Sequence, residues 1–434
     1  MIRSRLLAVL LIVLFVQTVV GQTDTLLQRI KSLPGVVDVT PMKTNNNFKS
    51  AYVIMIDQPV EHDNPGGMHF HQRIFLSHAD FTKPMVFVTE GYQADYAQNA
   101  MYSEELSRLL HSNQIVVEHR YFGKSLPSPL VWKYLNVKEA AGDHHHVVEI
   151  FRKLYPGKWV STGISKGGQT SLYFRFFYPN DIDATVAYVA PINFALEDPR
   201  EEEFLKKVGT AEVRAKIESF QKLLLQHKKE ILPEFEKKAQ RAKATFNRFG
   251  LEAAFDQTVL EFPFSYWQWC HTESEIPDNK ADNDMLLQAL CRIVPAQTFG
   301  DPEIEKFEPF FAQANSELGY YGYDVKPFKE WLTQKRYPNT VLGPQDLPVE
   351  YTSTPMKQVD EWLRTKAEKI ICIYGENDPW SASAARIENN PKTLKLYVKN
   401  GCHLSRIYNL SPDQKTQVNT KLHDWLGVDL TVNK

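Results

Sequence analysis

Ser165 stands among small residues in a pattern that can support nucleophilic catalysis. Residues 161–171 read S-T-G-I-S-K-G-G-Q-T-S, with Gly163 two positions before Ser165 and Gly167 two positions after it. Between a strand and a helix, a G-x-S-x-G sequence holds its serine in a strained turn where small neighbours avoid collision, and it exposes the hydroxyl above the sheet. Residues 158–163 have the pattern of a buried strand, so we predict that Ser165 is a nucleophile. A plain glycine-rich turn is the alternative.

A serine nucleophile needs a general base, and the base needs a carboxylate that orients it. In strand–turn–helix hydrolases the acid and then the histidine follow the serine in the chain, on loops after later strands. Asp378 follows the apolar stretch 369–375, and His403 follows the stretch 394–398. We therefore predict a Ser165–Asp378–His403 triad, in which His403 acts as general base and then as acid to the leaving amine. A histidine that merely decorates a surface loop is the alternative.

Two backbone N–H groups are expected to stabilise the developing oxyanion. The N–H of Lys166 opens the predicted helix after the nucleophile and can face the negative charge. The second donor should come from the loop after the strand at 85–89, where Gly91 or Tyr92 is the candidate. The Lys166 amine could also suggest a Ser–Lys pair, but His403 already supplies a base, so we assign Lys166 its backbone role.

These residues require a parallel sheet to position them. Short apolar runs alternate with helical stretches along the chain, which predicts a mostly parallel sheet covered by helices on both faces, an α/β fold. Residues 50–58 and 68–76 instead read as an antiparallel hairpin that precedes it. The predicted strands of the parallel part are 85–92, 115–123, 158–163, 184–191, 369–375 and 394–398, and the predicted helices include 102–110 and 143–154.

The middle of the chain has a different character. Apolar residues there recur at helical spacing among many Lys and Glu residues, and residues 261–270 form a dense aromatic cluster. We predict a sheet domain made of residues 22–194 and 355–434, interrupted by a helical insertion at 195–354. Within the insertion, residues 285–293 are expected to form one of the helices.

Composition limits the class of protein and its location. Of 434 residues, 43% are hydrophobic and 24% charged, and the formal net charge is −2, which is typical of a globular protein and gives no reason to expect a nucleic-acid partner. Arg3 and Arg5 precede an apolar run, 6–20, that ends in small residues. This pattern predicts a secretory signal at 1–21, cleaved after Gly21; an uncleaved anchor is the alternative. We expect a secreted or periplasmic protein without a stable membrane anchor after cleavage.

Cysteines and histidines give no sign of a metal site. Cys270 and Cys291 lie in one region and could form a disulfide, whereas Cys372 lies in a strand-like run and should be a buried thiol. No C-x-x-C pair is present. The three consecutive histidines 144–146 would point in different directions from a helix, so we expect them to be surface or partly buried residues rather than metal ligands.

Four segments together resemble a known family. Residues 118–127 (E-H-R-Y-F-G-K-S-L-P), 163–168 (G-I-S-K-G-G), 376–381 (E-N-D-P-W-S) and 401–403 (G-C-H) are similar to those of the secreted bacterial prolyl tri-/tetrapeptidyl aminopeptidases. These serine peptidases are related to the lysosomal Pro-Xaa carboxypeptidase and dipeptidyl peptidase. The lysosomal group carries an aromatic residue after the serine, so Lys166 favours the bacterial branch.

The resemblance implies an α/β-hydrolase fold with a helical cap, no cofactor, and release of short peptides from free N-termini, often after proline. The substrates would be oligopeptides, and the triad would be the same three residues. An aminopeptidase needs a carboxylate for the substrate ammonium, although each candidate could equally be a solvated acid: Glu273, Glu275 and Glu90. Four aromatic residues could hold a proline ring or simply form core: Tyr266, Trp267, Trp269 and Trp380.

The same residues are compatible with three other functions. A carboxylesterase or lipase would use the same triad on esters. A Pro-Xaa carboxypeptidase would need a cationic group for the substrate carboxylate and would tolerate an acetylated N-terminus. A hydrolase-like binding protein would usually lack a triad residue, and none is missing here.

Overall fold

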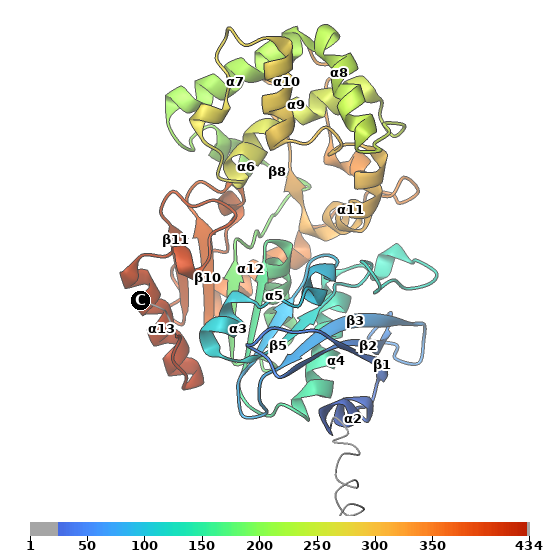
Figure 1. The fold of residues 1–434 in the computed structure, drawn as a ribbon, viewed down its shortest axis with the longest axis vertical. Helices are drawn as coiled ribbons and strands as arrows, with labels where there is room; N and C mark the ends of the chain where they lie inside the picture. Colours follow the sequence, from blue (N-terminus) through green and yellow to red (C-terminus); the bar gives the residue numbers. More distant parts are fainter. Residues whose placement is uncertain (1–24, 432–434) are drawn as a thin grey trace, which may run out of the picture.

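The computed structural model describes residues 25–431, and a nine-stranded sheet lies in the lower half of the view in Figure 1. The strand order is β1-β2-β3-β5-β4-β6-β7-β10-β11. The bounds are β1 Val36–Met42, β2 Ser50–Pro59, β3 His69–His78, β4 Met85–Thr89, β5 Asn113–Val117, β6 Trp159–Ile164, β7 Ala184–Tyr188, β10 Ile370–Gly375 and β11 Thr393–Val398. Neighbours from β1 to β5 pair antiparallel, and from β5 to β11 they pair parallel. The predicted α/β-hydrolase fold is therefore confirmed, including its leading hairpin.

Helices cover both faces of the sheet, which explains why its strands read as continuous apolar runs. Trp159 of β6 packs toward one face, with side chains of α4, α5 and α12, whereas its neighbour Val160 packs toward the other, with side chains of α3 and α13. The bounds of these helices, together with the N-terminal α2, are α2 Thr25–Lys31, α3 Glu105–Leu110, α4 Val137–Arg152, α5 Lys166–Phe177, α12 Thr354–Thr365 and α13 Pro412–Leu426.

Helix α4 begins six residues before its predicted start at 143. The side chain of Asn136 accepts a hydrogen bond from the Glu139 N–H at 2.9 Å and caps the helix. An N-cap of this kind satisfies backbone donors that the first turn leaves unpaired. Apolar spacing alone does not show where a helix begins, so the first turn after the cap, which includes Lys138 and Glu139, was not predicted.

A second group of helices lies beyond the carboxyl ends of the strands (Figure 1). Side chains of α7 to α11 form a hydrophobic core of their own, and a short parallel pair, β8 with β9, joins the two ends of this segment. The bounds are β8 Glu197–Asp198, α6 Pro199–Leu205, α7 Ala211–Gln226, α8 Lys228–Arg241, α9 Leu251–Gln268, α10 Asn283–Ile293, α11 Asp301–Gln313 and β9 Tyr320–Tyr321. We call α6 to α11 the helical layer; the domain limits at 195 and 354 stay a prediction.

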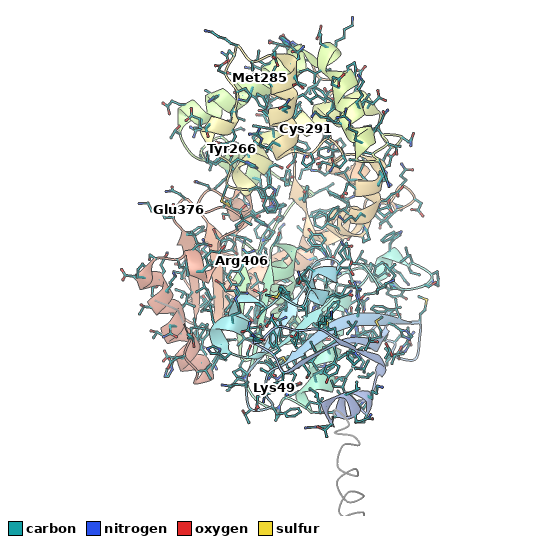
Figure 2. All side chains as sticks on the ribbon, in the orientation of Figure 1. Lys49, Tyr266, Met285, Cys291, Glu376 and Arg406 are labelled. Atoms are coloured by element: carbon teal, nitrogen blue, oxygen red, sulfur yellow. A yellow bond between two sulfur atoms is a disulfide. The ribbon has the colours of Figure 1, made fainter. Side chains whose placement is uncertain are left out.

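One disulfide joins the helical layer to the sheet domain. Cys270, just after α9, is bonded to Cys402, just after β11, with the two Cα atoms 5.4 Å apart. The expected bridge between Cys270 and Cys291 is therefore wrong, because Cys291 is a free thiol in the helical layer (Figure 2). Cys372 is free and buried, as predicted. A partner 132 residues away in sequence is a tertiary contact that local spacing does not reveal.

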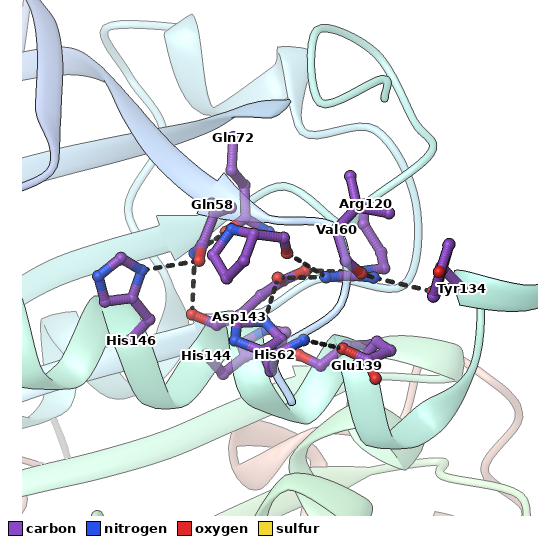
Figure 3. A network of polar contacts seen from close by, with 12 residues as sticks. Gln58, Val60, His62, Gln72, Arg120, Tyr134, Glu139, Asp143, His144 and His146 are labelled. Carbon is purple, nitrogen blue, oxygen red and sulfur yellow. Dashed lines mark hydrogen bonds and ion pairs between the residues drawn. The ribbon is translucent and has the colours of Figure 1, made fainter. Parts of the chain in front are cut away.

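The three consecutive histidines contact three different partners. The Nδ1 atom of His144 lies 2.6 Å from the Ala140 carbonyl oxygen, that of His145 lies 2.7 Å from Asp181, and that of His146 lies 2.8 Å from Gln58. Figure 3 shows the His146 ring directed toward Gln58. His145 and His146 thus fasten α4 to other parts of the chain, whereas the His144 contact lies within α4.

Across residues 25–431, no helix has both the length and the apolar character needed to cross a bilayer. The predicted signal at 1–21 lies outside the described residues.

Candidate active site

Ser165 occupies the turn between β6 and α5 in a strained backbone conformation. Its φ and ψ are 57° and −124°, a region that residues other than glycine rarely adopt. Its N–H donates to the Tyr188 carbonyl at 2.9 Å, which ties the turn to the neighbouring strand. A Cβ atom on Gly163 would lie 2.7 Å from the Thr89 carbonyl oxygen. The small residues around Ser165 are thus required by close approach of the backbone.

His403 and Asp378 form a buried pair on the loops that follow β11 and β10. The His403 Nδ1 atom lies 2.8 Å from Asp378 Oδ2, and both side chains are almost fully buried. Asp378 also accepts a hydrogen bond from the Trp380 N–H at 3.2 Å, which fixes the carboxylate. A carboxylate at Nδ1 orients the ring and leaves Nε2 to exchange a proton with a nucleophile.

Ser165 and His403 line one cavity of about 540 Å³. Within residues 25–431, the Ser165 hydroxyl has no hydrogen-bond partner; in unliganded enzymes such contacts often tighten only when substrate binds. A second cavity, of about 450 Å³, lies on the helical-layer side and contains Glu261 in its wall. Both cavities have four lining residues in common, namely Tyr92, Gln268, Trp269 and Phe307. The two cavities therefore adjoin, and we call the pair the cleft.

The structure brings two of the predicted substrate-binding residues to the cleft. Glu90 lines the Ser165 cavity, and Trp269 lines both cavities with its ring 5.8 Å from that of His403. Tyr266 and Trp267 pack within the core of the helical layer. Trp380 packs against Phe264, with ring centroids 5.1 Å apart, and lines neither cavity of the cleft.

Glu273 and Glu275 lie away from the cleft, in a short 3₁₀ turn at the surface. Glu273 is exposed and lies 3.8 Å from the Lys216 amine, while Glu275 contacts His271 at 2.9 Å. Glu275 also accepts from the Thr272 N–H at 2.8 Å, so it helps to cap this turn. The aromatic stretch in front of these acids is the end of α9, and the chain turns outward after it.

Glu261 is a cleft residue that sequence reasoning missed. Its buried carboxylate accepts hydrogen bonds from Ser265 at 2.7 Å, Tyr321 at 2.8 Å and Tyr323 at 2.9 Å. Burial raises its pKa. A lone acid at the head of an aromatic stretch is the signal that could have found it, because a carboxylate is rarely buried without a partner or a purpose.

The wall beside Ser165 holds further ionisable groups. Enclosure in the protein raises the pKa of Glu90 to about 7, and the Tyr96 hydroxyl donates to its carboxylate. Glu104 lies in the same wall, where burial also raises its pKa. The amine of Lys166 is buried, and burial lowers its pKa to about 7.

The segment 118–127 supports the loop after β4. Glu118 accepts from the Ala94 N–H at 3.0 Å and from the Ser125 hydroxyl at 2.9 Å. Arg120 binds both carboxylate oxygens of Asp143, at 2.7 and 2.6 Å (Figure 3). Glu118 and Arg120 build the frame beneath the site and do not line the Ser165 cavity, whereas Phe122 of the same segment does.

Comparisons with known proteins identify the family of this chain. The profile of the family described as PS-10 peptidase S37 matches residues 22–433. Over 413 residues the chain is 34% identical to the prolyl tri/tetrapeptidyl aminopeptidase of Streptomyces mobaraensis, covering 92% of this chain and 84% of the relative. It is also 24% identical to the mouse lysosomal Pro-X carboxypeptidase over 190 residues, covering 40% of this chain and 39% of that protein.

Among solved structures, the proline iminopeptidase of Mycobacterium smegmatis aligns with a TM-score of 0.42 and 12% identity, covering 85% of this chain and 98% of that one. The resemblance seen in the four sequence segments is confirmed by the family match and by the Streptomyces relative. The chain belongs to the PS-10 peptidase S37 family and is a serine peptidase.

Proposed function

We propose that this chain is an exported serine exopeptidase that releases tri- or tetrapeptides from free N-termini, with a preference for proline before the cut. The observation that carries the proposal is the buried His403–Asp378 pair in the cavity wall beside the strained Ser165. The name of the Streptomyces relative, which is 34% identical, supports the substrate class. Disulfides persist in oxidising compartments, so the Cys270–Cys402 bridge supports export.

The reaction follows from the roles of the three side chains. Ser165 Oγ attacks the scissile carbonyl carbon while His403 Nε2 takes the hydroxyl proton, and Asp378 stabilises the imidazolium. The tetrahedral oxyanion then collapses, and His403 returns the proton to the leaving amine, so a peptide shorter at its N-terminus departs. Water attacks the acyl-enzyme with His403 again as base, which frees the short peptide and restores Ser165.

Glu261 is the carboxylate that we assign to the substrate ammonium. Glu90 directly precedes Gly91 of the predicted oxyanion loop, so its carboxylate lies close to the scissile bond. A terminal ammonium three residues upstream lies about 10 Å from that bond, at 3.3–3.6 Å per extended residue. Glu261 lines the adjoining cavity, and its buried carboxylate would gain a charged partner when the ammonium binds.

The aromatic wall of the cleft supports a preference for proline. Trp269 stands between the two cavities and beside the His403 ring. Phe307, from α11, also lines both cavities. A proline ring has no N–H to satisfy, so these apolar surfaces can enclose it without leaving a polar group unpaired.

A panel of peptide amides tests this function. Tri- and tetrapeptide amides ending in proline would be compared with free and acetylated N-termini, beside a short-chain ester, using the wild-type chain and Ser165→Ala. We expect turnover of the free-amine peptides alone, and its loss in Ser165→Ala. Equal turnover of acetylated peptides, or peptide hydrolysis retained by Ser165→Ala, would contradict the proposal.

A Pro-Xaa carboxypeptidase is the second candidate, because Lys306 and Arg406 line the Ser165 cavity and could bind a substrate carboxylate. The same panel separates the two functions. A carboxypeptidase would lose activity when the C-terminal carboxylate is amidated and would keep it when the N-terminus is acetylated.

A further inference from the structure

The side chain of Lys166 carries a buried amine beside the nucleophile that the reaction above does not use. Lys166 is 2% exposed, and its Nζ atom donates to the Gly91 carbonyl oxygen at 2.6 Å. The same atom lies 5.4 Å from the Tyr92 ring centroid and 5.2 Å from that of Phe122. Burial of an amine is unfavourable unless it has partners, so this placement calls for a function.

The contact with Gly91 sets the direction of the next N–H group. In a trans peptide unit, the C=O of one residue and the N–H of the next point in opposite directions. Lys166 holds the Gly91 carbonyl, so the Tyr92 N–H points away from the Lys166 amine. In the described part of the chain, that N–H donates no hydrogen bond, and Tyr92 itself lines the Ser165 cavity.

Packing against the Lys166 side chain also holds the Gly91–Tyr92 loop in place. A Cβ atom on Gly91 would lie 2.6 Å from both Cβ and Cγ of Lys166, so only glycine allows the loop to rest on the lysine stem. The Tyr92 carbonyl accepts from the His119 N–H at 3.2 Å. The loop is therefore held at two successive carbonyls, one on each side of the Tyr92 N–H.

We propose that Lys166 is a positioning residue for the oxyanion hole. Its side chain clamps the Gly91–Tyr92 peptide so that the Tyr92 N–H is the second donor, while its own backbone N–H is the first. One residue then determines the spacing of both donors, because its main chain opens α5 and its side chain orients the loop after β4. This inference rests on the proposed Ser165 chemistry.

The test uses Lys166→Met, which keeps the length of the stem and removes the amine. Lys395→Met is the control: its side chain is 6% exposed, and its Nζ donates to the Ala385 carbonyl at 2.9 Å and to Glu388, away from the cleft. Four quantities are measured: kcat and KM on a free-amine peptide amide, Ki of a peptidyl trifluoromethyl ketone, and Ki of the product tripeptide. The ketone forms an anionic adduct with a serine and so reports on the oxyanion hole.

We expect Lys166→Met to lower kcat by about 10²-fold or more, the usual effect of losing one oxyanion donor. The Ki of the ketone should rise by a similar factor, while KM and the Ki of the product tripeptide should stay close to the wild-type values. If Lys166 had only a structural role, its replacement would change the Ki of the ketone and the Ki of the product tripeptide by similar factors. Lys395→Met should leave all four quantities unchanged.

Gly91→Ala is a second test, because the added methyl group pushes the loop away while Lys166 stays intact. We expect this variant also to raise the Ki of the ketone and to leave the Ki of the product tripeptide close to the wild-type value. If Lys166→Met does not fold, as judged by thermal unfolding, Gly91→Ala and Lys166→Leu decide. Wild-type kcat and ketone Ki in any folded Lys166 variant would overturn the inference and leave the proposed function intact. An inactive wild-type chain, or an active Ser165→Ala, would instead overturn the proposed function.

Discussion

Glu261 receives all three of its side-chain hydrogen bonds from uncharged hydroxyl groups. A carboxylate held in this way is fixed in position, but among residues 25–431 no cation pairs with it. Hydrogen bonds to charged groups contribute about 1.5–3 kcal/mol, so an ammonium that reaches Glu261 would be bound with measurable selectivity over a neutral group.

Glu261→Gln keeps the shape of the side chain and removes its charge. We expect kcat/KM on free-amine peptides to fall by about 10–100-fold, following the loss of a charged hydrogen bond, with little change for acetylated analogues. The measurement is the ratio of kcat/KM between free and acetylated substrates. Glu273→Gln, at an exposed position outside the cleft, is the matched control, and an unchanged ratio in Glu261→Gln would refute the assignment.

Residues that directly follow successive parallel strands could be proposed as site residues from the sequence alone. Ser165, Asp378 and His403 each follow a parallel strand, and the carboxyl ends of such strands lie along one edge of the sheet. Glu261 and Cys402 depend instead on how the helical layer packs on that edge. The positions of Glu273 and Glu275 were likewise set by a local turn after α9, which apolar periodicity does not describe.

At the scale of elements, the pair Arg120–Asp143 joins α4 to the segment after β5. Asp143 is fully buried, and although burial opposes its charge, the Arg120 guanidinium and His62 hold its pKa at about 2. Since the folded-state pKa lies below the ordinary value, the pair stabilises the fold above about pH 4. That contribution is lost as pH falls from about 4 through about 2.

Asp143→Asn leaves the buried Arg120 without a counter-charge. We expect the free energy of unfolding at pH 7 to fall by about 3–5 kcal/mol, the usual effect of breaking a buried ion pair, and the stability of the variant to vary less between pH 4 and pH 2. Denaturant unfolding across this pH range measures both. Asp63→Asn, which removes an exposed partner of Lys138, should change stability by less than about 1 kcal/mol; a similar loss in both variants would refute the role of the pair.

Most of the elements could be predicted because their residues alternate between two buried faces or repeat at helical spacing. The strands β4, β6, β7, β10 and β11 match predicted apolar runs. The start of α4 was predicted six residues too far along the chain, because its first turn depends on the Asn136 cap. The aromatic stretch 261–270 continues α9 even though Pro263 lies inside the helix, since burial of its rings outweighs the lost hydrogen bond.

At the scale of the whole molecule, the cleft lies between the sheet and the helical layer. The Ser165 cavity is lined both by residues of the sheet domain and by Lys306 and Phe307 of α11. We expect a short peptide to enter this cavity in an extended form, whereas a folded protein would first have to unfold its N-terminal segment.

We therefore expect cleavage to depend on the fold of the substrate. A small protein with a proline near its N-terminus should be cut only after denaturation, while a synthetic peptide with the same first ten residues should be cut at once. Release of the N-terminal tri- or tetrapeptide, followed by mass spectrometry, is the measurement. Equal rates on the native protein and on the peptide would show that the helical layer does not restrict access.

The Cys270–Cys402 bridge also determines how the helical layer can move. Cys402 directly precedes His403, whose N–H donates to the Gln268 carbonyl at the end of α9, so the end of α9 and the histidine loop move as one rigid piece. In any motion of the helical layer, this covalent link keeps the end of α9 beside the imidazole. Reduction of the bridge would release that constraint and leave the hydrogen bond from the His403 N–H to hold the two segments together.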